Sequence, residues 1–358
     1  MKKSILTLFL LALIAFGSDG QTIRRCNNNP GVTGVNMYTT IQAAHDAAVA
    51  GDIIYLEPSS VSYGNLDARK RLTIIGNGYF LDKNTNVSFD SRKSEVGSIT
   101  FNNGSANSLL NGVYSVSGVG NTITINDVNI TVTRCYLPTI NFGLSTNLVA
   151  GLNSRGNNGT VTKCVIINQV AGQNAVNTIS QYGYNCTFSN NIMNYRFFNL
   201  TNCVISNNVF NSGTSVISTE AIYGSTISNN IFDARGRTTT YDANSAGTGN
   251  TFSNNICLGQ AMIPSGNGNV NFGDETITFL VVNPWSSVTT EDSKFQLGVS
   301  SPAISVGSGG TNAGAFGGAS PYVLSGMPAY PVITNYVVSG VGNSSTPLTV
   351  SVTVRGNN

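Results

Sequence analysis

A Ser-Asn-Asn motif that recurs through the middle of the chain constrains the fold more than any other feature of this sequence. It stands in four segments: CTFSNNIM at 186–193, CVISNNVF at 203–210, STISNNIF at 225–232 and NTFSNNIC at 250–257. Earlier segments fit the same frame with cysteine, in TVTRCYL (131–137) and TVTKCVI (160–166), and more loosely with glycine, in SLLNGVY (108–114). The second asparagine and its equivalents define a frame position, occupied in chain order by Gly112, Cys135, Cys164, Asn191, Asn208, Asn230 and Asn255. Such self-similarity indicates a repeat architecture.

Each repeat alternates polar and apolar residues around the frame position. The residue three before it is apolar in every repeat, the residue two before it is threonine or serine in six, and the residue after it is again apolar. Period-two alternation is typical of strands, so each repeat is predicted to be a strand, a sharp corner and a second strand. Asparagine tolerates the left-handed backbone of such a corner, which predicts the frame asparagine as the corner residue. Stacked side chains are then expected to form a structural ladder of Asn191, Asn208, Asn230 and Asn255.

Successive frame positions are 17 to 29 residues apart. Variable spacing around a constant corner indicates coils that stack, with loops that absorb the differences in length. Two-helix repeats are longer, about 33–47 residues, and favour Ala, Leu, Glu and Lys rather than the Asn, Thr, Ser, Ile and Val found here. The sequence therefore predicts an all-β, single-stranded parallel β-helix, a solenoid in which each coil adds about 4.8 Å.

The flanks of the repeats carry a family resemblance. The segments YTTIQAAHDAAVAGDIIYLEPSS (38–60), RLTIIGNGYFL (71–81) and DSKFQLGVSSPAISVGSGGTNAGAFGG (292–318) are similar to the first and the terminal coils of right-handed parallel β-helix proteins of the pectin-lyase-like superfamily, and more narrowly to secreted β-helix proteins of Bacteroidetes. The resemblance covers about 38–330 and implies a right-handed helix. Asn312 stands where that terminal coil commonly has an aspartate. Activity is poorly specified, because the superfamily includes lyases, hydrolases, binders and adhesins.

The chain divides into three predicted parts. Residues 1–20 have a basic start, an apolar centre and small residues at the end, which predicts an export signal and a secreted or cell-surface protein. Residues 21–328 are assigned to the β-helix, with a cap helix over about 41–50 that covers the first coil. On that helix His45 is expected to pack against the cap or face solvent rather than to bind a ligand. Residues 329–358 contain the alternating run LTVSVTVRG, which predicts a short C-terminal β-segment that covers the last coil or attaches the protein.

The low charge of the chain excludes several partners. Lys and Arg number 18 and Asp and Glu 16 in 358 residues, for a formal net charge of +2, so the basic footprint of a nucleic-acid binder is missing. After the export signal, no segment approaches the ~20 apolar residues of a membrane span. One histidine and six cysteines without a C-x-x-C pair predict no metal site and no cofactor. We expect a monomer.

Two pairs of cysteines are expected to be neighbours in adjacent coils. Cys135 and Cys164 both occupy the frame position, and Cys186 and Cys203 both lie five residues before it. Adjacent coils meet the Cα separation of a disulfide, ~4.4–6.8 Å, but parallel side-chain directions disfavour its dihedral angle. Buried free thiols are therefore favoured over disulfides.

Acidic residues are scarce where a polysaccharide-cleaving β-helix would need them. Hydrolysis needs paired carboxylates, and elimination needs calcium ligands with an Arg or Lys base. Between Val96 and Thr219 the only acidic residue is Asp127. Further along, Glu220 and Asp242 each lie 12 residues past a frame asparagine, so equal offsets would stack them in adjacent coils.

The charged cluster around these two carboxylates is a weak candidate site. The candidates are Glu220, Asp242 and Arg235 for catalysis, and Asp233, Arg235, Arg237, Tyr241 and Asp242 for substrate binding. Acids, guanidinium donors and an aromatic platform suit a sugar. The plainer interpretation is a solvated loop held by Asp–Arg pairs.

Three functional hypotheses remain open. The favoured one is a non-catalytic secreted protein that binds or displays extracellular polysaccharide. The alternative is a polysaccharide lyase or glycoside hydrolase acting on acidic polysaccharide, and calcium is expected only in that case. The remote one is an ice- or water-ordering surface, because Thr-x-Thr or Thr-x-Ser pairs recur at 131/133, 160/162, 187/189, 226/228 and 251/253.

Overall fold

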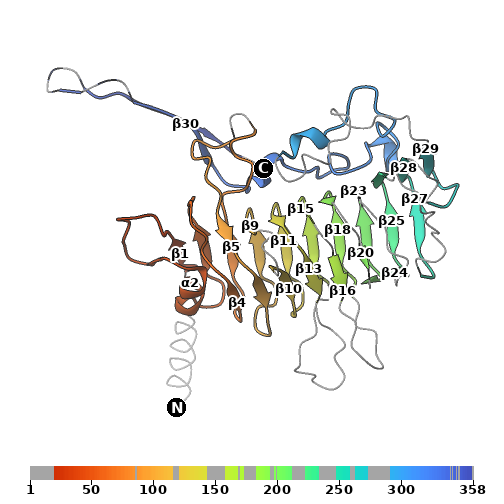
Figure 1. Ribbon diagram of the computed structural model, residues 1–358, viewed down its shortest axis with the longest axis horizontal. Helices are drawn as coiled ribbons and strands as arrows, with labels where there is room; N and C mark the ends of the chain where they lie inside the picture. Colours follow the sequence, from red (N-terminus) through yellow and green to blue (C-terminus); the bar gives the residue numbers. More distant parts are fainter. Residues whose placement is uncertain are drawn as a thin grey trace, which may run out of the picture.

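The computed structural model shows a solenoid of stacked coils, with its axis horizontal in Figure 1. The residues described are 20–356 except 85–86, 116–120, 143–157, 168–169, 173–182, 194–196, 199, 212–221, 234–246, 259–262, 273–290, 339, 341, 344 and 346. Within them, short strands pair in parallel with their equivalents in the next coil. This arrangement is a parallel β-helix, which confirms the fold class predicted from the repeats.

Sheet A and sheet C flank the corner that the Ser-Asn-Asn motif forms. Sheet A contains β2 (Met37–Tyr38), β1 (Ile23–Cys26), β3 (Ile53–Leu56), β5 (Thr73–Ile75), β8 (Leu109–Asn111), β11 (Thr131–Thr133), β14 (Thr160–Thr162), β18 (Thr187–Ser189), β22 (Val204–Ser206), β25 (Thr226–Ser228) and β27 (Thr251–Ser253). Sheet C contains β6 (Glu95–Val96), β9 (Tyr114–Ser115), β12 (Tyr136–Leu137), β15 (Val165–Ile166), β19 (Ile192–Met193), β23 (Val209–Asn211), β26 (Ile231–Asp233), β28 (Ile256–Leu258) and β29 (Val270–Phe272).

Two shorter parallel sheets complete the wall. Sheet B contains β4 (Leu66–Ala68), β7 (Ile99–Phe101), β10 (Ile123–Ile125), β13 (Ile140–Phe142), β16 (Val170–Gly172) and β20 (Phe197–Phe198). Sheet D contains β17 (Gly183–Tyr184), β21 (Leu200–Thr201) and β24 (Ile222–Tyr223). Inward side chains at every second position, such as Val132, Val161 and Phe188 in sheet A, form one apolar column along the axis. Burial of this column provides the main driving force for stacking.

The corner is made by the first asparagine of the motif, not by the second as the sequence predicted. Asn190, Asn207, Asn229 and Asn254 have φ between 54° and 57°, in the left-handed region. The frame asparagine that follows each of them lies in the interior with no exposed surface. The physical reason is that the residue in the left-handed conformation bends the chain from sheet A into sheet C with its side chain outside, so that the next side chain enters the core.

The frame is also displaced by one residue in the earliest repeat. Leu110 pairs with Val132 and Asn111 with Thr133, so Gly112 is equivalent to the corner residue Arg134. Gly112 has a φ of 68°, as a corner residue requires. The frame position of this coil is therefore Val113, whose backbone N–H points to Cys135 Sγ at 3.5 Å.

A helical cap covers the first coil, as expected. Helix α2 spans Ile41–Ala47, shorter than the predicted 41–50, and Thr40 Oγ1 accepts a hydrogen bond from the Ala43 N–H at 3.2 Å. It ends early because Ala48 is already extended, and Gly51 then turns the chain with a φ of 102°. The apolar side of the helix is buried against the first coil.

The segment 291–330 is not a terminal coil, which corrects the expectation from the family resemblance. It runs back along the outside of sheet C from the last coils toward the first (Figure 1). Its 3-10 turns are η3 (Ser293–Phe295), η4 (Ser308–Gly310) and η5 (Leu324–Gly326). We call this segment the tail. It covers an outward row of apolar side chains on sheet C: Tyr136, Val165, Ile192, Val209, Ile231 and Ile256.

The corner residues hold the tail by hydrogen bonds to its backbone. The contacts, in tail order, are Asn254 Nδ2 to Val306 O at 3.0 Å, Ser308 N to Asn229 Oδ1 at 2.9 Å, Asn207 Nδ2 to Asn312 O at 3.4 Å, Asn190 Nδ2 to Ala315 O at 2.9 Å, and Arg134 Nη1 to Met327 O at 2.6 Å. Residues further along the tail contact corner residues of earlier coils. The tail and the coil stack therefore run in opposite directions.

The chain ends in an antiparallel hairpin of β30 (Val332–Val338) and β31 (Val350–Arg355), the β-segment expected from the alternating run. It projects beside the first coils rather than covering the last ones (Figure 1). None of the helices that the structure describes is long and apolar enough to cross a membrane.

Candidate functional site

The sequence-predicted charged cluster lies almost entirely outside the described residues. This applies to Glu220, Arg235, Arg237, Tyr241 and Asp242, so their stacking stays a prediction. Asp233 is described: it ends β26 between Asn211 and Leu258 of the adjacent coils and is only 3% exposed. Its side chain is therefore buried, in contrast to the solvated loop that the sequence suggested.

The frame asparagines form a continuous hydrogen-bonded column in the interior. Asn191 Nδ2 donates to Asn208 Oδ1 at 2.9 Å, and the same contact joins Asn208 to Asn230 and Asn230 to Asn255 at 3.0 Å each. Each of these Oδ1 atoms also accepts the backbone N–H of the preceding asparagine. The column satisfies backbone donors that the corner leaves unpaired, which explains why amides are placed in an apolar interior.

Cysteine continues this column toward the N-terminus. The Cys164 N–H donates to Asn191 Oδ1 at 3.0 Å, and the Cys135 N–H points to Cys164 Sγ at 3.4 Å. Cys186 and Cys203 are also neighbours, thiol to thiol. All six cysteines are free and buried, as the sequence favoured. Burial raises the pKa of Cys164 well above its ordinary value, so it remains a thiol that packs rather than a nucleophile.

Other ionisable residues singled out by the sequence have structural partners. Asp127 Oδ2 accepts the backbone N–H groups of Gly104 and Ala106 at 3.0 and 2.9 Å. His45 is buried, and its Nε2 accepts the Arg69 N–H at 3.0 Å. In the part of the chain that the structure describes, no group of three His, Cys, Asp or Glu side chains could hold a metal ion.

The Thr and Ser pairs of sheet A form two rows in register. One row contains Thr131, Thr160, Thr187, Val204, Thr226 and Thr251, and the other contains Thr133, Thr162, Ser189, Ser206, Ser228 and Ser253. Val204 interrupts the first row, and in the second the hydroxyls of Thr162 and Ser189 lie 3.1 Å apart. Interruption and internal hydrogen bonding both reduce the regular array that water ordering would require.

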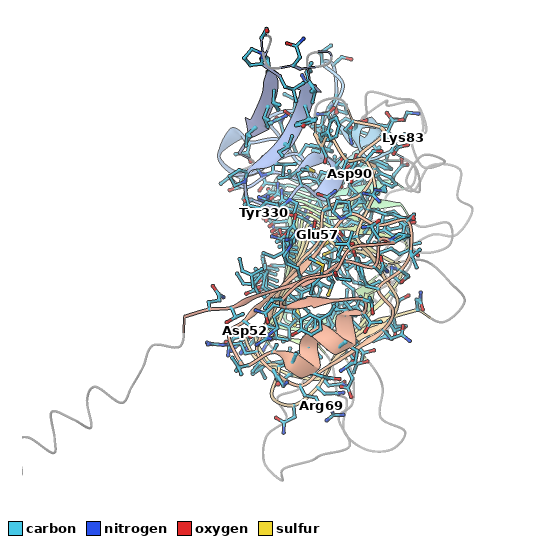
Figure 2. The ribbon with its side chains drawn as sticks, turned by 90° about the vertical axis from the view of Figure 1, so that its left-hand side faces the viewer. Asp52, Glu57, Arg69, Lys83, Asp90 and Tyr330 are labelled. Atoms are coloured by element: carbon cyan, nitrogen blue, oxygen red, sulfur yellow. The ribbon has the colours of Figure 1, made fainter. Side chains whose placement is uncertain are left out.

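A pocket of about 400 Å³ with charged residues in its lining lies beside the first coils. We call it the cationic pocket; its lining is Ser59, Ser60, Phe80, Asp82, Lys83, Ser91, Arg92, Lys93 and Tyr114. Most of these residues belong to the 79–93 loop between β5 and β6, and Tyr114 comes from β9. Figure 2 shows Lys83 and Asp90 on one side of the molecule and Arg69 near the opposite end.

Each cation of this pocket has a carboxylate partner. The pairs are Lys83 with Asp82 at 2.9 Å, Arg92 with Asp90 at 2.7 Å and Lys93 with Glu95 at 3.0 Å. The hydrogen bond from Lys83 lowers the pKa of Asp82. Burial acts to raise the pKa of Asp90, but hydrogen bonds and the positive charge of Arg92 hold it below its ordinary value. Both carboxyl groups are therefore ionised at neutral pH.

Two half-buried aromatic rings face these charges. Lys93 Nζ lies 3.5 Å from the centre of the Tyr114 ring, whose other face stacks on Tyr136 with centroids 4.7 Å apart. Phe80 has a φ of 52°. A bulky side chain rarely adopts this left-handed conformation, which costs roughly 1–3 kcal/mol and is concentrated at binding and active sites.

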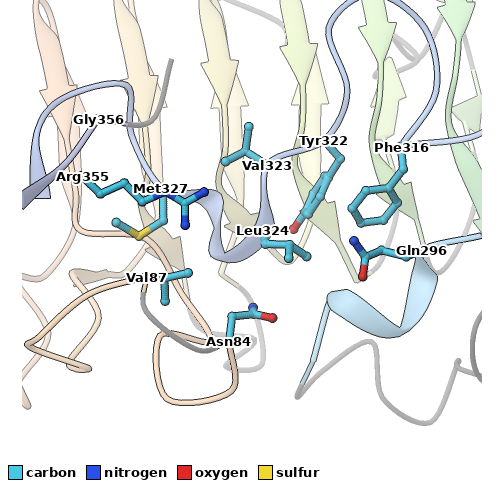
Figure 3. A pocket seen from close by; sticks show the side chains of 10 residues that line it. All are labelled: Asn84, Val87, Gln296, Phe316, Tyr322, Val323, Leu324, Met327, Arg355 and Gly356. Carbon is cyan, nitrogen blue, oxygen red and sulfur yellow. The ribbon is translucent and has the colours of Figure 1, made fainter. Parts of the chain in front are cut away.

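A second cavity, of about 460 Å³, opens where the tail passes the 79–93 loop and the end of the hairpin (Figure 3). We call it the tail groove. Its lining is Asn84, Val87, Gln296, Phe316, Tyr322, Val323, Leu324, Met327, Arg355 and Gly356. Four separate parts of the chain thus contribute, and they share no residue with the cationic pocket.

A buried carboxyl group fixes the wall of the tail groove. Asp292 is 1% exposed and accepts hydrogen bonds from Asn84 Nδ2 at 2.8 Å, Tyr322 Oη at 2.8 Å and the Ser325 N–H at 2.7 Å. The hydroxyls of Tyr322 and Tyr79 lie 2.5 Å apart. Burial raises the pKa of Asp292 despite these three donors. The network joins the tail to the 79–93 loop.

Sequence reasoning missed both cavities. The cationic pocket had a usable signal, because Asp82, Lys83, Asp90, Arg92, Lys93 and Glu95 fall within 14 residues of a chain that is only 9% charged. The tail groove had none, because its residues are scattered from Asn84 to Gly356. Comparison with known proteins adds no assignment: no family model and no curated protein matches this chain.

Proposed function

We propose that the protein is an exported, non-catalytic binder of extracellular polysaccharide and that the cationic pocket holds the sugar. The observation that carries the proposal is the lining of this pocket, where three ion pairs and three serines share the pocket with the half-buried ring of Phe80. A sugar presents hydroxyl groups around an apolar C–H face. Convergent polar groups beside aromatic side chains provide partners for both.

The balance of charge in the pocket favours a ligand rich in hydroxyl groups over a strongly anionic one. Lys83, Arg92 and Lys93 are each neutralised by a carboxylate. Surface ion pairs contribute little to stability, so one partner of each pair can be exchanged for a sugar hydroxyl at small cost. The pocket then offers both donors and acceptors to vicinal hydroxyl groups.

Binding is better supported than cleavage. Hydrolysis needs a carboxyl group that is protonated near neutral pH, close to a second carboxylate. Asp82 and Asp90 have lowered pKa values and cannot supply that proton. Asp292 has a raised pKa, but its oxygens are occupied by hydrogen bonds and it lines neither cavity.

The test is a binding screen on immobilised polysaccharides, followed by calorimetry with the best oligosaccharide. Changing Lys83→Ala and Arg92→Ala together is expected to weaken binding roughly tenfold or more, because two charged donors are lost. Arg69→Ala is the matched control, since Arg69 is an exposed cation paired with Asp67 at 3.0 Å outside the pocket. Equal affinity of the double variant and the control would contradict the proposal.

The same panel, incubated with and without calcium, tests the absence of catalysis. We expect neither unsaturated products nor new reducing ends. Release of either by the purified protein would favour the lyase or hydrolase alternative.

A further inference from the structure

We propose that the tail groove is a second binding site and that it takes a sugar acid, a pyranose that carries a carboxylate. This site goes beyond the proposed function, because it is built by different residues and recognises a different chemical group. Its volume of about 460 Å³ falls within the range of small-ligand sites, about 300–1,000 Å³. One ring with its substituents fits within such a space.

The groove has a cation at its mouth. Arg355 extends from the end of β31, and Figure 3 shows its guanidinium group directed over Met327 into the groove. Among the described residues it has no ion-pair or hydrogen-bond partner through its side chain. A guanidinium fork matches two coplanar oxygen atoms, so the complementary ligand group is a carboxylate.

An amide acceptor, Asn84 Oδ1, lies deeper in the groove. Asn84 is 9% exposed, and its Nδ2 donates to Asp292 Oδ1 and Ser325 Oγ, each at 2.8 Å. These two bonds fix the amide orientation and leave Oδ1 without a partner in the described structure. In Figure 3 this oxygen is on the side of Gln296, whose amide also lines the groove. An accessible acceptor with no protein donor among the described residues favours a ligand hydroxyl at this position.

The remaining wall is apolar. Val87, Leu324 and Met327 contribute alkyl surface between Arg355 and Asn84, and the ring of Phe316 lies beside Gln296 (Figure 3). A pyranose acid has the matching pattern, with a carboxylate at one end, hydroxyl donors at the rim and a C–H face between them. A bare inorganic anion would leave both the apolar wall and the Asn84 acceptor unused.

The site is held in place by the Asp292 network rather than by its ligand. Asp292 joins Asn84 of the loop to Tyr322 and Ser325 of the tail. Groups that are already ordered lose less conformational freedom on binding. The buried acid therefore positions the groove without contacting the ligand.

The experiment uses the intact protein with methyl groups of Leu, Val and Met labelled for NMR. The probes are methyl β-glucuronide, methyl β-glucoside and sodium sulfate. The glucuronide is expected to shift the methyl signals of Val87, Leu324 and Met327 and to bind roughly tenfold or more tightly than the other two probes. Arg355→Gln is expected to remove this preference, whereas Arg69→Gln, the same change at an exposed cation outside both cavities, leaves it intact.

Three results would overturn the proposal: equal binding of sulfate and glucuronide, which reveals an anion site only; shifts confined to other methyl groups; or an unchanged preference in Arg355→Gln. A Gln296→Leu variant, remote from the hairpin ladder, provides a second readout if Arg355→Gln disturbs the hairpin, and it too must weaken glucuronide binding. These outcomes are independent of the cationic pocket, because they are scored at methyl groups that line only the tail groove.

Discussion

The two consecutive asparagines of each repeat form two columns, one inside the solenoid and one on its surface, and the two columns stabilise different parts of the structure. The inner column, exemplified by Asn208, bonds each coil to the next in the apolar interior. The outer column, exemplified by Asn207, turns the chain with a φ of 55° and holds the tail. The inner asparagines bond to one another within the repeat, whereas the outer asparagines bond to the tail, about 100 residues further along the chain. The same repeat therefore provides both the contacts between coils and a row of surface asparagines that binds the tail.

The inner column is expected to be the more sensitive of the two. Asn208→Ala removes the acceptor of the Asn191 N–H and of the Asn191 side chain, together with two donated bonds. Buried donors without partners should lower the free energy of unfolding by about 3–5 kcal/mol. Denaturant unfolding measures this value. If Asn208→Ala lowers the free energy of unfolding no more than Asn207→Ala does, the inner column is not the more sensitive one.

The Asp292 network fixes the tail where it reaches the 79–93 loop. Loss of this network should cause the next largest decrease in the free energy of unfolding. Asp292→Ala leaves donors from Asn84, Tyr322 and Ser325 without an acceptor, which is expected to cost about 2–4 kcal/mol. The readout is again denaturant unfolding. Asp292→Asn, which keeps the shape and one of the two acceptor oxygens, should lose less stability than Asp292→Ala, and an equal loss in both variants would contradict the role given to the network.

The raised pKa of Asp292 also sets the sign of a pH effect. The folded state binds the proton more tightly than the unfolded state, so this group stabilises the fold below the ordinary aspartate pKa. That contribution is lost as the pH rises through the raised folded value. The melting temperature of the native protein relative to Asp292→Asn should therefore fall across this interval. A rise would show that the ionised form is the one the network favours.

The outer column should respond to backbone conformation more than to side-chain chemistry. Asn207→Ala places an ordinary residue in the left-handed region and removes the bond to Asn312, with an expected loss of about 1–2 kcal/mol. Asn207→Gly keeps the conformation and should lose less. Paired unfolding curves of the two variants test this order, and the reverse order would indicate that the hydrogen bond dominates.

The smallest effect concerns the cysteines of the interior. Burial raises the pKa of Cys26 to about 12 and that of Cys164 well above its ordinary value. Because all six thiols are buried, Cys203 with its lowered pKa included, we expect none to react with a disulfide reagent in the native protein at neutral pH and all six to react after denaturation. Rapid reaction in the native state, or fewer than six thiols in denaturant, would contradict the packing described here.

The repeat could be predicted because its pattern is local. Polar and apolar residues alternate within seven or eight positions, so the strands and the stacked column of frame asparagines follow from the sequence alone. Which of two consecutive asparagines forms the corner could not be read, because both tolerate that conformation. The apolar pair Val165-Ile166 was a hint that sheet C is covered on both faces.

The tail could not be predicted, because its contacts join distant residues without a repeated pattern. Tyr79 and Tyr322 meet across 243 positions, and Arg134 binds Met327 across 193. The tail groove could not be predicted for the same reason, because its lining residues are distant in the sequence. The charged residues at 220–242 and those of the cationic pocket are each close together in the sequence, whereas the tail groove depends on how the chain returns.

The arrangement described here requires the tail to return along the outer column to the first coils. Ring-to-ring nuclear Overhauser effects in protein with labelled tyrosines test it most directly. The account predicts a contact between Tyr55 and Tyr330, whose ring centroids lie 5.8 Å apart, and between Tyr79 and Tyr322. Absence of both contacts, with rapid amide exchange through residues 304–327, would contradict it.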